Sequence, residues 1–157
     1  MLKINRKWSV SISLALTVIA FAGLIAAAFF LPAFVGYLLS VPKMSGEAQN
    51  VSAVGHGFFL AGCYIILLFA MLGIALLFFL LLQVRKSRVF TPKAIALTRC
   101  ISWCVFGIGL LFLPLSFVFP LLSFAAFACL LFGLCLRVVK NVLAEAAAIK
   151  SENDLTV

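Results

Sequence analysis

The segment QVRKSRVFTPKAIALTR, residues 83–99, is the only strongly charged interruption in the long apolar middle of this sequence. It holds five of the twelve basic residues and no acidic residue. Apolar runs long enough to cross a bilayer lie on either side of it. Because lysine and arginine are enriched on the cytoplasmic side of membrane proteins, this segment fixes the orientation of the spans that flank it.

The composition indicates an integral membrane protein. Of the 157 residues, 66% are hydrophobic and 10% are charged, and the mean hydropathy is +1.31. A soluble domain is about one quarter charged, and a chain this apolar could not cover its core with polar surface. The net charge of +8 does not indicate direct nucleic-acid binding, because the basic residues cluster at the ends of the apolar runs. We therefore expect the lipid bilayer to be the main environment of the chain.

Four membrane spans are expected, at about 8–31, 58–82, 100–118 and 120–139. Residues 100–136 carry no charge, and a single helix of that length would measure about 55 Å, nearly twice the roughly 30 Å hydrocarbon core. Two spans fit better, with a turn around residues 117–123 that contains Pro120, and with Pro114 kinking the third helix. Four spans also leave eleven of the twelve basic residues, all but Lys43, in the cytoplasm.

The expected fold is all-α, a single membrane domain over residues 1–157 with four transmembrane helices in an antiparallel bundle. Both termini are expected in the cytoplasm, with the protein in the cell (inner or plasma) membrane. Residues 140–157 form a cytoplasmic helix and tail, because the pattern past Arg137 becomes amphipathic. The outer segment 33–39 either lies along the membrane surface or extends the first helix. The first apolar run exceeds a signal-peptide core of about 7–15 residues, which favours an uncleaved anchor over a cleaved leader.

The sequence predicts no catalytic, cofactor or metal site. All four acidic residues lie in loops or in the C-terminal helix and tail, so none can pair with a catalytic partner inside a span. Cys100 and Cys104 are one helical turn apart, but a metal site needs more ligands. The only histidine, His56, falls on the opposite side of the membrane. We therefore expect the protein not to be an enzyme.

Small residues four positions apart predict close helix contacts. Gly23 and Ala27 form such a pair in the first span, where the alternative is that alanine and glycine are simply common in such helices. Ala125, Cys129 and Gly133 form a stripe in the fourth span, which we expect to pack against another span. Such faces would also serve an oligomer.

Charge and topology favour a small regulatory or interaction protein that docks a cytoplasmic partner through the 83–99 loop and the C-terminal helix. Two alternatives stay open. The chain could be an accessory subunit of a transporter complex, although its spans, apart from Arg137 at the end of the fourth, lack the ionisable groups that mark ion and substrate paths. The basic loop could also serve topology alone. The predicted docking residues are Arg85, Lys86, Arg88, Phe90, Thr91, Lys93, Arg99, Glu152 and Asp154.

Residues VFTP at 89–92, continuing to RCISW at 99–103, resemble the second-loop signature of a bacterial membrane family catalogued as domain-of-unknown-function family 2975. The ending ENDLTV at 152–157 is similar to that of the same family. Lys93 and Ala94 depart from the acidic-Asn element of the signature. The resemblance implies four spans with both termini inside. Because members are often encoded beside small helix-turn-helix regulators, it also implies a regulatory partner of that kind. The matching residues are Phe90, Thr91, Ile95, Arg99, Ile101 and Trp103.

Overall fold

The computed structural model describes residues 6–40, 53–86 and 91–155. These residues form four α-helices, which are α1 (Arg6–Ser40), α2 (Ala53–Arg85), α3 (Pro92–Ser116) and α4 (Leu122–Leu155). Each helix is long and apolar enough to cross a membrane. Even α3, with 25 residues, measures about 37 Å, more than the roughly 30 Å hydrocarbon core. The prediction of an all-helical, multi-pass membrane protein is confirmed at this level.

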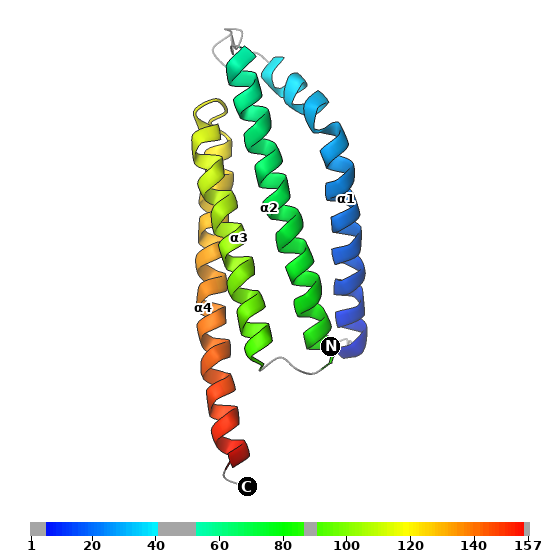
Figure 1. Ribbon diagram of the computed structural model, residues 1–157, viewed down its shortest axis with the longest axis vertical. Coiled ribbons are helices and arrows are strands. Elements are labelled where there is room, and N and C mark those ends of the chain that lie inside the picture. Colours follow the sequence, from blue (N-terminus) through cyan, green and yellow to red (C-terminus); the bar gives the residue numbers. More distant parts are fainter. Residues whose placement is uncertain (1–5, 41–52, 87–90, 156–157) are drawn as a thin grey trace, which may run out of the picture.

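The four helices lie in a row, and neighbouring helices run in opposite directions (Figure 1). Each consecutive pair packs together, whereas within residues 6–40, 53–86 and 91–155 the backbone of α1 does not come close to that of α3 or α4, nor that of α2 to α4. This arrangement is more open than the predicted bundle. Many large apolar side chains are exposed, including Ile19, Leu68 and Phe132. Lipid solvates such side chains as well as a protein core does, so helices in a membrane need no closed apolar centre.

A small apolar core lies where the end of α1, the start of α2 and the end of α3 come together. It consists of Val35 and Leu39 from α1, Phe59 from α2 and Leu115 from α3, all buried. The last turns of α1 lean towards α2 (Figure 1), and Pro32 lies inside α1 just before them. Proline removes a backbone hydrogen bond and so allows a helix to bend. Residues 33–39 therefore extend the first helix, which is the second of the two predicted alternatives.

Local sequence explains both ends of α3. Thr91 is extended, with φ −121° and ψ 149°, and its Oγ1 accepts a hydrogen bond of 3.4 Å from the backbone N–H of Ala94. Pro92 follows at the start of the helix, where a missing N–H costs nothing. At the other end the N–H of Phe119 donates to the carbonyl of Leu115 at 3.1 Å. The turn between α3 and α4 thus falls within the predicted residues 117–123.

Helices α3 and α4 approach closely because glycines face the neighbouring helix. A Cβ atom on Gly109 would lie 3.0 Å from Leu130 Cγ and 3.2 Å from the carbonyl oxygen of Ala126. A Cβ atom on Gly133 would lie 3.3 Å from Cδ2 of Phe106. The predicted stripe in the fourth span is therefore right at Gly133. At the end of the stripe nearest the turn between α3 and α4, the fully buried small residue is Ala126 rather than the predicted Ala125.

The predicted small-residue face of the first span is open. A Cβ atom on Gly23 would meet nothing within 4 Å in the part of the chain that the structure describes. Ala27 is also exposed. None of the other described helices packs closely on the face at Gly23.

Candidate functional site

The basic residues of the described segments lie towards the level at which α2 ends and α3 begins. Arg85 is the last residue of α2, Lys86 follows it in a turn, and Lys93 lies in the first turn of α3. All three side chains are exposed, as is that of Arg99 one to two turns further along α3. Two predicted docking residues, Arg88 and Phe90, lie outside the described residues. The exposed cations are therefore available to an anionic partner, whether protein or lipid.

Thr91 has a structural task in this site. Its hydroxyl caps α3, and its carbonyl accepts the N–H of Ile95 at 3.2 Å. An N-cap of this type satisfies backbone donors that the first turn of a helix otherwise leaves unpaired. Thr91 thereby fixes where α3 begins and how Lys93 is presented. Its place among the predicted docking residues stays a prediction.

The acidic residues of the C-terminal tail lie apart from the ends of α2 and α3. The last turns of α4, red in Figure 1, extend past the lower ends of the other helices. Glu152 is exposed on this extension, and Asp154 belongs to the same helix, although its side chain is outside the description. The structure therefore does not bring Glu152 against Arg85 or Lys93 to form one mixed-charge surface.

The structure brings together three cations from two segments that lie far apart in the sequence. Arg99 comes from the start of α3, whereas Arg137 and Lys140 come from the middle of α4. With Ser102, Trp103 and Asn141 they line a hollow of about 300 Å³ between the two helices. We call this space the basic hollow. The sequence contains a pattern that could have indicated the hollow. Arg99 and Trp103 are four residues apart, as are Arg137 and Asn141, so each pair shares a helix face.

Contacts between α3 and α4 build the wall of the basic hollow. The guanidinium carbon of Arg137 lies 4.7 Å from the centroid of the Trp103 ring. Within α3, Trp103 meets Phe106 edge-on, with ring centroids 6.3 Å apart and an interplanar angle of 80°. The buried hydroxyl of Ser102 donates a 2.8 Å hydrogen bond to the carbonyl oxygen of Gly133 across the helix interface. These contacts hold the two lining faces in register.

The cysteines do not combine into a site. Cys100 is exposed and Cys104 is buried, and all five cysteines are free thiols. Among residues 6–40, 53–86 and 91–155, no group of three or more histidine, cysteine or acidic side chains gathers in a way that would hold a metal ion.

Comparison with known proteins identifies the family. The family model described as "Protein of unknown function (DUF2975)" matches residues 7–157, which is nearly the whole chain. The chain belongs to the DUF2975 family. No match was found among curated proteins or among solved structures. The resemblance drawn from the second-loop residues and from the C-terminal ending is thus confirmed.

In this DUF2975 protein, several residues that carried the resemblance have clear structural roles. Thr91 caps α3, Ile101 is buried, and Trp103 supports Arg137 beside the basic hollow. Arg99 lines the same hollow. The described part of the signature therefore builds the start of α3 and its contact with α4.

Proposed function

We propose that this DUF2975 protein is a non-catalytic membrane protein that holds a cytoplasmic protein partner at the inner membrane surface. The docking surface consists of the basic segment 83–99 and the C-terminal part of α4. The proposal includes four antiparallel spans with both termini, the basic segment and the end of α4 in the cytoplasm of the cell membrane.

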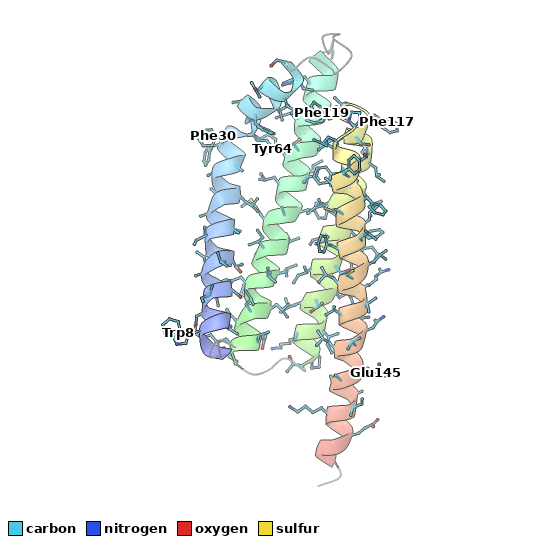
Figure 2. All side chains as sticks on the ribbon, turned by 180° about the vertical axis from the view of Figure 1, so that it is seen from behind. Trp8, Phe30, Tyr64, Phe117, Phe119 and Glu145 are labelled. Carbon is cyan, nitrogen blue, oxygen red and sulfur yellow. The ribbon has the colours of Figure 1, made fainter. Side chains whose placement is uncertain are left out.

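The observation that carries the proposal is the extension of α4 beyond the other helices. Figure 2 shows Glu145 on α4 where the neighbouring helices have ended. From Asn141 to Leu155 the helix adds about 22 Å. Val142 and Ile149 fall within 20° of one another around the helix and are both exposed. An apolar stripe on a helix that has left the membrane is a typical surface for a protein partner.

The distribution of charge supports the proposed orientation. Arg85, Lys86, Lys93 and Lys150 all lie on the side where α1 begins and α4 ends. The turn between α3 and α4, at the opposite end, contains no charged residue. Basic residues favour the cytoplasmic side, so this end is the inner one.

The chemistry of the surface favours an acidic partner. Arg85, Lys86 and Lys93 are exposed cations at the ends of two neighbouring helices. Complementary charge on a partner would speed the encounter and fix its register more than it would raise affinity. The family resemblance implies a small DNA-binding regulator as the partner, and the exposed cations would suit an acidic patch on it.

The test compares partner retention by two variants of equal charge. The full-length protein is purified from its native membrane in mild detergent, and co-purifying proteins are identified by mass spectrometry. The triple variant Arg85→Gln, Lys86→Gln, Arg88→Gln keeps Lys93 and Arg99 to orient the loop. We expect it to insert normally and to lose most of the bound partner. The control, Lys3→Gln, Arg6→Gln, Lys7→Gln, also removes three positive charges but lies outside the docking surface, and it should retain the partner.

The other outcomes decide against docking. A retained integral transporter in place of a cytoplasmic protein would favour the accessory-subunit alternative. Equal retention by the triple variant and the wild type would leave the basic loop as a topology signal only, as would the absence of any co-purifying protein.

A further inference from the structure

We propose that the basic hollow between α3 and α4 binds the phosphate group of an anionic phospholipid. The ligand is defined by its chemistry, a phosphate ester at the inner membrane surface with acyl chains that follow the helices into the bilayer. This site shares Arg99 with the proposed docking segment 83–99, but it does not require a protein partner.

The charge of the hollow calls for an anion. Arg99, Arg137 and Lys140 all line it, and no acidic residue does. No ion pair with Arg99 or Lys140 is seen within the described ranges, and the contact to Arg137 is the neutral ring of Trp103. Three like charges that share a hollow of about 300 Å³ repel one another. A bound phosphate would relieve this repulsion.

The donors suit a phosphate group in particular. Arginine presents a planar fork of N–H groups that matches two phosphate oxygens, whereas lysine supplies a compact positive charge. The side-chain amide of Asn141 adds a further donor at the same hollow. The ring of Trp103 already holds Arg137 in place, and the Ser102–Gly133 hydrogen bond fixes the helices on which the cations stand. Less ordering is therefore needed when the anion binds.

The surroundings of the hollow favour a lipid over a free phosphate ion. Leu110 lies seven residues after Trp103 and Leu134 lies seven residues before Asn141, so each shares a helix face with a lining residue. Both leucines are about half exposed, at 50%. They extend from the hollow towards the middle of the membrane and offer an apolar path for an acyl chain. A basic pocket between spans, with such a path beside it, is a typical headgroup site.

The experiment measures lipid retention by native mass spectrometry of the full-length protein in detergent. Phosphatidylglycerol is added as the anionic probe and phosphatidylcholine as the zwitterionic comparison. The test variant is Arg99→Gln, Lys140→Gln. The control is Arg6→Gln, Lys7→Gln, which removes the same charge at the start of α1, a helix whose backbone does not come close to α3 or α4 in the described ranges. Since Arg99 and Lys140 have no ion-pair partner there, their loss should leave the fold intact, which melting temperature checks.

The expected result is selective. The wild type and the control should retain phosphatidylglycerol over phosphatidylcholine, and the test variant should retain about tenfold less phosphatidylglycerol. The single variant Lys140→Gln leaves α3 unchanged and should show part of this loss. It provides the test if the double variant fails to fold.

Three results would overturn the proposal. Equal retention of the two lipids by the wild type would remove the case for an anion site. An equal loss in the control would indicate attraction to the whole basic end rather than binding in the hollow. The third result is displacement of phosphatidylglycerol by millimolar inorganic phosphate, together with a phosphate-dependent rise in the melting temperature of the wild type that is absent from the variant Arg99→Gln, Lys140→Gln. This result would assign the hollow to a soluble phosphate instead of a lipid.

Discussion

The guanidinium carbon of Arg137 lies 4.7 Å from the centroid of the Trp103 ring, so a charged side chain of α4 rests on an aromatic face of α3. Trp103 also meets Phe106, and Phe106 lies against Gly133, one helical turn before Arg137. The tryptophan thus holds the guanidinium group of Arg137, which is the first charged residue after the apolar part of α4. A cation on a tryptophan face is attracted by the ring quadrupole, more so where water is scarce.

Replacement of Trp103 by leucine should destabilise the protein by on the order of 1 kcal/mol, because the cation–π contact is lost. The measurement is thermal unfolding of the purified protein in detergent. The matched control is Trp8→Leu. Trp8 is a second exposed tryptophan, labelled at the lower end of α1 in Figure 2. Equal losses in the two variants would show that the contact with Arg137 contributes nothing.

Replacement of Ser102 by alanine should cost roughly 0.6 kcal/mol, the mean found for hydrogen bonds between membrane helices. The hydroxyl of Ser102 donates to Gly133 on the neighbouring helix at 2.8 Å. Ser116→Ala is the control, since the hydroxyl of Ser116 donates to Leu113 within its own helix at 2.6 Å. Thermal unfolding of both variants checks the difference. A larger loss for Ser116→Ala would contradict a role for Ser102 in joining α3 to α4.

Replacement of Gly109 by leucine should destabilise the protein by about 1–3 kcal/mol, because the new side chain must displace Leu130 and the backbone of Ala126. The same change at Gly23 should be nearly neutral, since nothing described lies within 4 Å of a Cβ there. Unfolding in a denaturing detergent measures both. A strong loss for Gly23→Leu would instead indicate that this open face is covered by a second molecule.

The parts of the fold that follow from local chemistry could be predicted from the sequence. Thr91 and Pro92 are typical of a helix start, and α3 begins there. The charge-free run 100–136 is too long for one span, and the structure divides it at a turn that contains Pro120. In both cases a few neighbouring residues, or the thickness of a bilayer, determine the result.

The parts that depend on pairing between helices could not be predicted. A helix that is apolar all round has no preferred buried face in its sequence. The spacing of small residues therefore predicted a contact every four residues, but not which side of α4 faces α3 and buries Ala126. The basic hollow needs Arg99 and Arg137 on facing helices, and only the packing of α3 on α4 brings them together. The sequence therefore could predict that these residues are interfacial, but not that they share a site.

The final prediction concerns the sidedness of the membrane protein. In a variant without cysteine, single cysteines are placed at Lys93, Leu121 and Glu152, all of which are exposed. A membrane-impermeant thiol reagent added to intact cells should label position 121 and spare positions 93 and 152. All three should react after the membrane is permeabilised. The reason is that Lys93 and the end of α4 lie with the basic residues, whereas Leu121 lies in the uncharged turn at the opposite end.

Each contrary pattern has its own meaning. Labelling at position 152 with protection at position 93 would mean that α3 and α4 do not both cross, although each is long and apolar enough to do so. Labelling at positions 93 and 152 with protection at position 121 would invert the whole protein. Arg85 and the α4 extension would then face away from the cytoplasm, and a cytoplasmic partner could not reach them. The basic hollow would keep its cations in that case, but it would face the opposite leaflet, so the lipid test and the labelling test can fail independently.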